Sequence, residues 1–326
     1  MTHPFRRKLL IAAMLGLSAS LAFAQGNAAW PNKPIKLVVP YAAGGPADVV
    51  ARELALVLTN DLKQAVTVEN QGGGMGVPAL GVVVRAEPDG HTLLLAAFGN
   101  MVLQPMLSKK GGADLVAKLK PVSTISTGPH VLVVSAKMPV KNIPELIDYA
   151  RANPGKVSFA SAGTGGTAHL GMEMFKALSK TDVIHVPYKG SAGAVNDLIS
   201  GEVSAMFSSL PSLQGLADKG LVKVLAATAP SKSNATKSLP LLGTALPGFD
   251  YTTWYAMYAP LATPKPVVDA INTALTKALK TPALVAKIEA AGTELQPGSP
   301  EEVQAWTQRD TEKWSRVIRD AKIAVD

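Results

Sequence analysis

The chain repeats one pattern: a short apolar run, a turn rich in glycine, and a segment with apolar residues at helical spacing. Residues 35–40 form such a run closed by proline, a Gly-Gly-Pro turn follows, and residues 47–58 show the helical spacing. Short apolar runs indicate buried strands, and a period near 3.6 indicates helices. Strands that alternate with helices in this way predict parallel sheets covered by helices on both faces.

The pattern occurs in two series without a strict internal repeat, and 326 residues are enough for two domains. The first series continues with strands over 66–69 and 92–96 around a helix over 77–85. The second series has strands over 131–134, 157–160, 183–186, 203–207 and 222–226, with helices over 142–152 and from 167. A strand over 254–258 and helices over 264–279, 282–290 and 300–323 complete the chain. The shared architecture predicts two similar α/β domains.

The first 24 residues have the features of a secretory signal peptide. Three basic residues, 6–8, precede an apolar run over 9–23, and Ala22-Phe23-Ala24 places small residues where a signal peptidase cleaves. The run has about 15 apolar residues, fewer than the ~20 that a membrane-spanning helix needs. We therefore expect cleavage after Ala24 and a soluble protein of the periplasm.

Charge and cysteine content exclude several classes of function. Removal of the leader takes away three positive charges, so the net charge falls from +8 to +5, and the remaining basic residues are dispersed. Dispersed charge argues against nucleic-acid binding, which requires a basic patch. The sequence has no cysteine, which excludes disulfides and thiolate metal sites. We expect neither a metal nor a cofactor.

The turn after the first strand is a candidate binding site, because open α/β sheets bind ligands where a strand ends and a helix begins. Unpaired backbone N–H groups and the helix dipole favour an anion there. A purely structural turn is the alternative. The candidate residues are Tyr41, Ala43, Gly44, Gly45, Ala47 and Asp48.

Two side chains of this turn have alternative interpretations. Asp48 is either a first-turn residue that complements the helix dipole, or a residue that orients the loop or accepts a hydrogen bond from the ligand. Tyr41 is either a core ring or a lid over the ligand.

A second turn of the same type lies in the second series. It combines glycines with small hydroxyl residues, which offer hydrogen-bond donors to an anion. One such loop in each half indicates an anion held from both sides, either a carboxylate or a dicarboxylate. The candidate residues are Ser161, Ala162, Gly163, Thr164, Gly165, Thr167 and His169.

Enzyme motifs give little support to a catalytic function. Residues 163–168 match the dinucleotide fingerprint G-x-G-x-x-[GA], with Asp182 near the spacing of a ribose-binding acid, but the loop lies in mid-chain of an exported protein. The sequence contains no G-x-S-x-G and no H-E-x-x-H motif. His91, His130, His169 and His185 have no neighbouring nucleophile in the sequence, so we interpret them as structural, with His169 also able to line a cleft.

Seven motifs, in order, carry a resemblance to a known family. They are Trp30-Pro-x-Lys-Pro-Ile, Val39 to Asp48, Val68-Glu-Asn-Gln-Gly-Gly-Gly74, Pro88-Asp-Gly-His-Thr-Leu93, Phe159 to Gly165, His185-Val-Pro-Tyr-Lys-Gly190, and Trp254 with Ala259-Pro-Leu-Ala-Thr-Pro264. Over the whole mature length the chain resembles the Bug family, the periplasmic solute-binding proteins of tripartite tricarboxylate transporters.

The resemblance implies a two-domain, type II periplasmic binding protein that closes around a small organic carboxylate. One domain would combine 29–127 with 246–326, the other would span 128–245, and the two crossings would form the hinge. The two loops above would bind the ligand, mainly through backbone amides, small hydroxyls and waters, without arginine. The resemblance adds Phe98 and Asn100, from the loop after the third strand, and Ser208 is a further candidate for ligand binding.

Two positions depart from the family pattern. The usual Asn-Arg-x-Gly-Ala-Gly is here Asn70-Gln71-Gly72-Gly73-Gly74-Met75, and a hydroxyl residue frequent before the first-loop acid is here Ala47. The second departure removes a side-chain donor to the carboxylate.

The resemblance implies a function in uptake. We expect a monomer that binds a carboxylate without catalysis and docks on the integral membrane subunits of a transporter. The alternatives are a secreted hydrolase or isomerase with the same cleft, and a sensor that presents its ligand to a membrane kinase.

Overall fold

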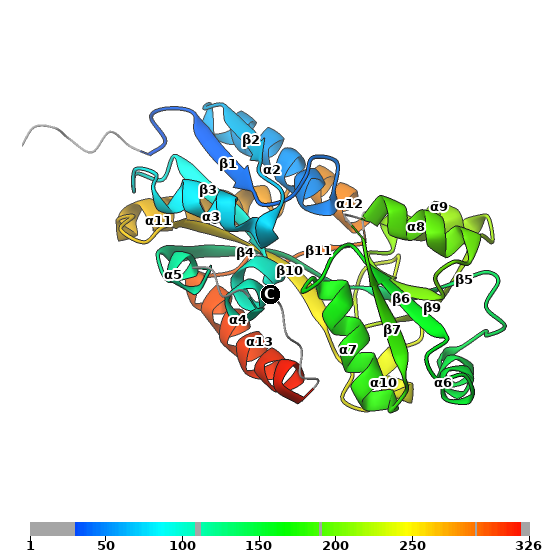
Figure 1. Ribbon diagram of the computed structural model, residues 1–326. Helices are drawn as coiled ribbons and strands as arrows, with labels where there is room; N and C mark the ends of the chain where they lie inside the picture. Colours follow the sequence, from blue (N-terminus) through cyan, green and yellow to red (C-terminus); the bar gives the residue numbers. More distant parts are fainter. Residues whose placement is uncertain (1–29, 108–111, 189–190, 291, 321–326) are drawn as a thin grey trace, which may run out of the picture.

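The computed structural model describes residues 30–107, 112–188, 191–290 and 292–320, so the expected signal peptide and its cleavage site lie outside the described residues. Two β-sheets lie side by side, each flanked by helices (Figure 1). Within these ranges no helix is both long and apolar enough to cross a bilayer.

The first sheet has six strands in the order β11-β4-β10-β3-β1-β2. Its strands are β1 (Ile35–Val39), β2 (Val66–Asn70), β3 (Thr92–Ala97), β4 (Leu119–Pro129), β10 (Thr252–Pro260) and β11 (Glu294–Leu295). β1 pairs in parallel with both β2 and β3, because helices α2 (Pro46–Leu62) and α3 (Val77–Val84) return the chain between them. Three of its parallel strands therefore end at one edge of the sheet.

The second sheet has five strands in the order β7-β6-β8-β5-β9. Its strands are β5 (Val131–Ser135), β6 (Val157–Ser161), β7 (Val183–Pro187), β8 (Ala205–Ser208) and β9 (Val222–Ala227). β6 pairs in parallel with β7 and β8, so these three strands share a carboxyl edge. The connecting helices are α6 (Ile143–Ala152), α7 (Thr167–Ser179), α8 (Ser191–Ser200), α9 (Pro211–Asp218) and α10 (Leu242–Ala245).

The expectation of fully parallel sheets is wrong, because both sheets are mixed. β10 runs antiparallel to β3 and β4, and β5 runs antiparallel to β8 and β9. β5 and β10 are each the first strand after the chain crosses from one sheet to the other. Each of them enters its sheet from the opposite direction. The alternation of strands and helices predicts the parallel pairs, but it contains no information on these long-range pairs.

The strand β4 is missing from the sequence-based expectations, although it is the longest strand of the described chain. Ser123, Thr124, Ser126 and Thr127 interrupt its apolar residues, and Ser123 and Thr124 are buried with their hydroxyls bonded to carbonyl groups. Ser123 Oγ donates to Gly298 O at 2.9 Å, and Thr124 Oγ1 donates to Gln296 O at 2.6 Å. β4 pairs with β10 along its whole length, from Thr252 opposite Pro129 to Pro260 opposite Leu119.

The C-terminal helix α13 (Pro300–Asp320) joins the cores of the two sheets. The Trp314 ring lies 5.6 Å from that of Phe98, which follows β3, and 5.7 Å from that of Tyr251, which in turn lies 6.3 Å from Phe207 of β8 (centroid distances). All four side chains are almost fully buried. One continuous apolar core therefore extends from the first sheet through α13 into the second.

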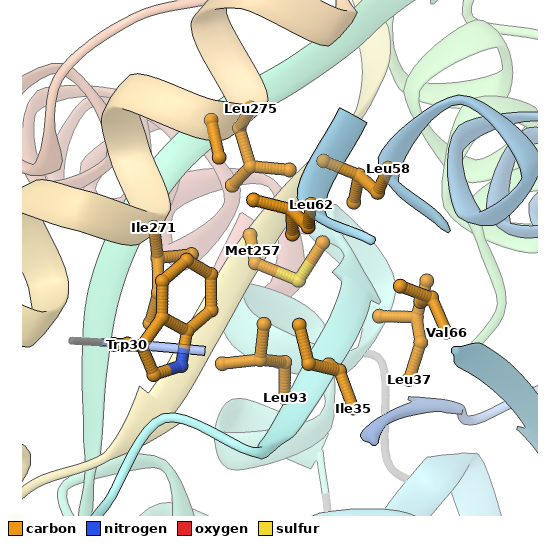
Figure 2. Close-up of a pocket in the computed structure, with 11 residues that line it drawn as sticks. Trp30, Ile35, Leu37, Leu58, Leu62, Val66, Leu93, Met257, Ile271 and Leu275 are labelled. Carbon is orange, nitrogen blue, oxygen red and sulfur yellow. The ribbon is translucent and has the colours of Figure 1, made fainter. Parts of the chain in front are cut away.

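The opposite face of the first sheet has a separate core under α2 and α11 (Lys265–Ala278). Figure 2 shows the side chains that meet there, with the Trp30 ring at one side. They enclose a cavity of about 10 Å³ lined only by apolar groups. Such a space is at most the size of one water molecule and offers it no polar partner, so it is a small packing gap and not a ligand site. The remaining helices are η1 (Gly74–Gly76), η2 (Gly99–Leu103), α4 (Gln104–Leu107), α5 (Gly112–Val116) and α12 (Pro282–Ala290).

A buried hydrogen bond attaches α13 to β10. Trp254 Nε1 donates to Asp310 Oδ2 at 2.7 Å, and the Arg309 guanidinium binds both oxygens of the same carboxylate. Asp310 is 4% exposed, so its charge lies inside the protein with these two partners.

We expect Asp310→Ala to lower the free energy of unfolding by about 2 kcal/mol, because the buried indole N–H would lose its acceptor. The same helix supplies a matched control, since Asp320 also follows an arginine but both side chains of that pair are more than 70% exposed. Asp320→Ala should change the stability by less than about 0.5 kcal/mol. Urea denaturation measures both values, and equal losses would contradict this account of α13.

Candidate functional site

Three loops meet at the carboxyl edge of the first sheet. They follow the parallel strands β1, β2 and β3 and comprise residues 40–45, 71–76 and 98–100. Asn70 Nδ2 donates to Tyr41 O at 3.2 Å, and Asn100 Nδ2 donates to Met75 O at 3.1 Å, so side chains connect the loops to one another. The edge where the sequence predicts a binding site is therefore a set of three interlinked loops.

The first loop has a defined conformation around two glycines. Gly44 has φ +84°, a left-handed value that glycine adopts without strain, and Gly45 is the extended N-cap of α2 with φ −81° and ψ 170°. The Gly44 N–H donates to Asp48 Oδ2 at 2.8 Å. Asp48 is the third residue of α2 and is 3% exposed. Its carboxylate orients the loop, which is one of the two interpretations given above.

A basic residue that the sequence patterns do not single out completes this network. Arg52 Nε donates to Asp48 Oδ2 at 2.9 Å, and Arg52 Nη2 donates to Asn70 Oδ1 at 3.1 Å. Burial by itself would raise the pKa of the Asp48 carboxyl, but the hydrogen bonds from Arg52, Gly44 and Asn70 together hold that pKa below its usual value. Asp48 is therefore ionised at neutral pH.

The second loop repeats the geometry of the first. Gly165 has φ +76°, and Gly166 is the extended N-cap of α7 with φ −75° and ψ 170°. The Gly165 N–H donates to His169 Nδ1 at 3.0 Å, so the third residue of α7 again accepts from the glycine four positions before it. The sequences Gly44-Gly45-Pro-Ala-Asp48 and Gly165-Gly166-Thr-Ala-His169 thus have the same local structure, in agreement with the second turn of the same type expected from the sequence.

Both helix starts present backbone N–H groups without a protein acceptor. The fourth residue of each helix donates to the N-cap carbonyl, Val49 to Gly45 at 3.0 Å and Leu170 to Gly166 at 3.1 Å. Among the described residues, no acceptor is in place for the amides of Ala47 and Asp48, or for those of Thr167, Ala168 and His169. These groups and the positive ends of the two helix dipoles can bind anions.

Residues from both sheets approach each other at these loops. A Cβ built on Gly99 would lie 3.8 Å from Tyr41 Oη and 3.9 Å from Thr167 Cγ2, so the first loop, the third loop and the start of α7 meet there. A Cβ built on Gly165 would lie 3.3 Å from both Met75 Cε and Leu107 Cδ1. The candidate site therefore lies between the two loops that the sequence identifies, with Tyr41 at its border.

Two stacked histidine side chains, His169 and His185, make hydrogen bonds to residues of the second loop. The His169 and His185 rings are stacked, with centroids 3.8 Å apart and planes 11° apart. Ser161 Oγ lies 2.7 Å from His185 Nε2 and donates to Gly163 O at 2.9 Å. Burial, together with the neighbouring His169, lowers the pKa of His185 to about 4. The sequence gives no sign of this pairing, because β7 brings His185 beside β6 only in the folded sheet.

The other residues predicted for the site lie partly in the core, partly between the loops and partly at the surface. The Phe98 side chain is fully buried against Trp254 and Trp314, so its ring belongs to the core. Asn100 is 3% exposed and holds the loops together, since its Oδ1 accepts from Ala97 N at 3.1 Å. Ser208 lies at the carboxyl edge of the second sheet, 3.0 Å from Ser212 (Oγ–Oγ). Ala43, Ala162 and Thr164 are exposed.

The remaining histidines are structural, as the sequence indicates. His91 Nε2 accepts from Asn32 N at 3.3 Å, and its ring lies 6.2 Å from that of Trp30. His130 Nδ1 is hydrogen-bonded to Tyr251 Oη where β4 leads into β5. Within the described ranges, no group of three or more histidine or acidic side chains is placed to hold a metal ion.

Solved structures define the class of protein to which this fold and site belong. An R. palustris protein solved with adipate has a TM-score of 0.84 at 30% identity, covering 91% of this chain and all of that one. The periplasmic binding protein BugD has a TM-score of 0.80 at 32% identity, with the same coverage. MatC from Rhodopseudomonas palustris, solved with bound malate, has a TM-score of 0.78 at 28% identity, covering 89% and 100%. The fold is that of a periplasmic solute-binding protein.

Sequence comparison identifies the family. Residues 50–323 match the family described as Tripartite tricarboxylate transporter family receptor, TctC. Protein BugT of Bordetella pertussis is 30% identical over 320 residues, covering 96% of this chain and 97% of that protein. A UPF0065 protein encoded between tcbD and tcbE in Pseudomonas sp. strain P51 is 34% identical over 323 residues, covering 98% and 95%. The chain belongs to this receptor family, so it is a solute-binding receptor for transport of the tripartite tricarboxylate type.

Glycine is required at position 165 by its conformation, and we expect Gly165→Ala to lower the free energy of unfolding by about 1–2 kcal/mol. The left-handed φ and the close contacts with Met75 and Leu107 both oppose a Cβ. Gly215 is the matched control, because it lies exposed in α9 and a Cβ there would have no atom within 4 Å. Gly215→Ala should raise the stability by up to about 1 kcal/mol. Urea denaturation measures both variants, and changes of the same sign would contradict the assignment.

Proposed function

We propose that this receptor captures a small organic carboxylate between its two helix starts and delivers it to the membrane subunits of a tripartite tricarboxylate transporter. The observation that carries the proposal is the repeated loop: two helix N-termini with free amides, one from each half, with Tyr41 of the first loop and Thr167 at the start of α7 both close to Gly99. Two carboxylate-bound relatives, solved with adipate and with malate, support this choice of ligand.

We propose the domain boundaries expected from the sequence, 29–127 with 246–326 and 128–245, with a hinge at the crossings. Support comes from three segments that meet there. His130 N donates to Thr228 Oγ1 at 2.9 Å, and Thr228 Oγ1 donates to Tyr251 O at 2.7 Å. Binding then favours the closed state, because only that state lets both loops touch one ligand.

The oligomeric state, the lack of catalysis and the location that we propose follow from the class of periplasmic solute-binding proteins. The chain acts as a monomer without catalysis or nucleic-acid binding, and the signal peptide 1–24 directs it to the periplasm. Ser161 and His185 are paired, but Ser161 is only 1% exposed and its hydroxyl donates to Gly163 O, which argues against a nucleophile.

Ligand binding must stabilise the native state, so we expect a carboxylate to raise the midpoint of thermal unfolding. The panel comprises adipate, malate, citrate and aspartate, with the corresponding amides as neutral controls. A ligand at about a hundred times its Kd should add about 2.7 kcal/mol of stability. No shift with any carboxylate, or an equal shift with the amides, would contradict the proposal. Recovery of chemically changed ligand would favour the hydrolase or isomerase.

A graded series at Gly99 tests the position of the ligand. Gly99→Ala adds a methyl group at ordinary contact distances from Tyr41 and Thr167, and Gly99→Val fills more of the space between the loops. We expect the carboxylate affinity to fall in the order glycine, alanine, valine, while the thermal midpoint of the unliganded protein changes little. The measurement is titration calorimetry, with Gly215→Ala as the control. Unchanged affinity in Gly99→Val would place the ligand elsewhere.

A further inference from the structure

The two binding loops are built alike but differ in one chemical respect. The third helical residue accepts the amide of the left-handed glycine in both, yet it is a carboxylate at Asp48 and an imidazole at His169. We infer that His169 is a positioning residue whose protonation releases the second loop, so that carboxylate affinity falls as the pH falls through the range in which histidine gains a proton. This inference rests on the proposed function.

The hydrogen bond from Gly165 determines the protonation state of the imidazole. A nitrogen that accepts an N–H must carry a lone pair, so neutral His169 has its proton on Nε2, which lies 3.6 Å from Glu173 Oε1. A second proton can be added only at Nδ1. That nitrogen then becomes a donor that faces the Gly165 donor at 3.0 Å, and the bond is lost.

Loss of this bond acts directly on the binding amides. Gly165 is buried, and a Cβ built on it would lie 3.3 Å from both Met75 and Leu107, so the residue has little room to turn away without moving the loop. The amides of Thr167 and Ala168 follow directly in the chain. Moving them by a fraction of an ångström misdirects donors that must point at one anion.

Two titratable side chains lie against His169, His185 of β7 and Glu173 of its own helix. His185 is stacked on the His169 ring, and its pKa is lowered to about 4, so His185 itself stays neutral above that pH. Glu173, one turn further along α7, lies with Oε1 3.6 Å from His169 Nε2, and His169 lowers the pKa of Glu173, which keeps it ionised beside the imidazole. Lys176 is the next charged residue of α7 and faces Glu173.

Two charged side chains of the neighbouring helix α13 already have partners of their own. α13 packs on α7, but Asp310 is bound to Trp254 and Arg309, and Lys313 is hydrogen-bonded to Asp250 O. The atoms nearest to a Cβ built on Gly165 belong to Met75 and Leu107, which carry no charge.

The first loop does not depend on pH in this range, because its acceptor is the Asp48 carboxylate. The pKa of Asp48 is held below its usual value, so its carboxylate loses its charge only in strong acid and accepts the Gly44 amide at every pH above that. The stabilisation from a carboxyl with a depressed pKa is present above its ordinary pKa and is lost only as the pH falls through the lowered one. Between about pH 8 and pH 5 only the second loop therefore changes.

The test measures the Kd of adipate and of malate from about pH 8 to about pH 5 for the wild type and two variants. His169→Asn places an oxygen at the position of Nδ1, so it keeps the acceptor but cannot titrate. His169→Leu removes the acceptor. We expect the wild type to bind about tenfold more weakly at the acid end, His169→Asn to be nearly flat, and His169→Leu to bind weakly throughout.

Each outcome decides the inference. A ligand carboxylate that gains a proton would affect the wild type and His169→Asn equally, so equal pH profiles would overturn the role of His169. A wild-type Kd independent of pH would do the same while leaving the proposed function intact, whereas no binding at any pH would overturn both. NMR of isotope-labelled histidine gives a test without variants: His169 must be the Nε2–H tautomer when neutral, and the Nδ1–H tautomer would refute the mechanism.

Discussion

Backbone amides left unpaired at the starts of α2 and α7 are the constraint on which the rest of the structure depends. A helix cannot bond its own first N–H groups, so each start needs an external acceptor. Here each loop is held open by a glycine in a left-handed conformation and by a side chain of the first helical turn, Asp48 or His169. The side chains thus bind the loop, and the amides stay free for an anion. In the proposed function, this division lets a site without an arginine in its loops favour a carboxylate.

The rest of the fold must hold these two helix starts in place. The antiparallel pair β4 and β10 and the hydrogen bonds of Thr228 connect the halves at the crossings. The aromatic contacts of Trp314 with Phe98 and Tyr251 extend one core through α13 into both sheets. α13 is therefore part of the connection, and its attachment through Asp310 bears on the relative position of the two loops.

Many of the strands and helices could be predicted from the sequence. The strands β1, β2, β3, β5, β6, β7 and β9 and the helices α2, α6 and α7 lie where periodicity and turn residues place them. β4 could not be found in this way, because its buried hydroxyls resemble a surface segment until their carbonyl partners are known. Similarly, the motif that places Phe98 in the site does not reveal that its ring packs in the core. A residue after a strand can point to either side of the sheet, and only packing decides which.

The sequence by itself determined the two α/β halves, the family, and the two glycine loops, because these depend on local periods and on short motifs. Even the repeat of the loops is visible in it, as Gly-Gly-Pro-Ala-Asp and Gly-Gly-Thr-Ala-His. Only the tertiary structure decided the antiparallel pairs, the joint core, the approach of Tyr41 to Thr167 at Gly99, and the stacking of His169 on His185. These contacts join residues far apart in the chain, and side-chain type alone does not specify which distant groups become neighbours when the chain folds.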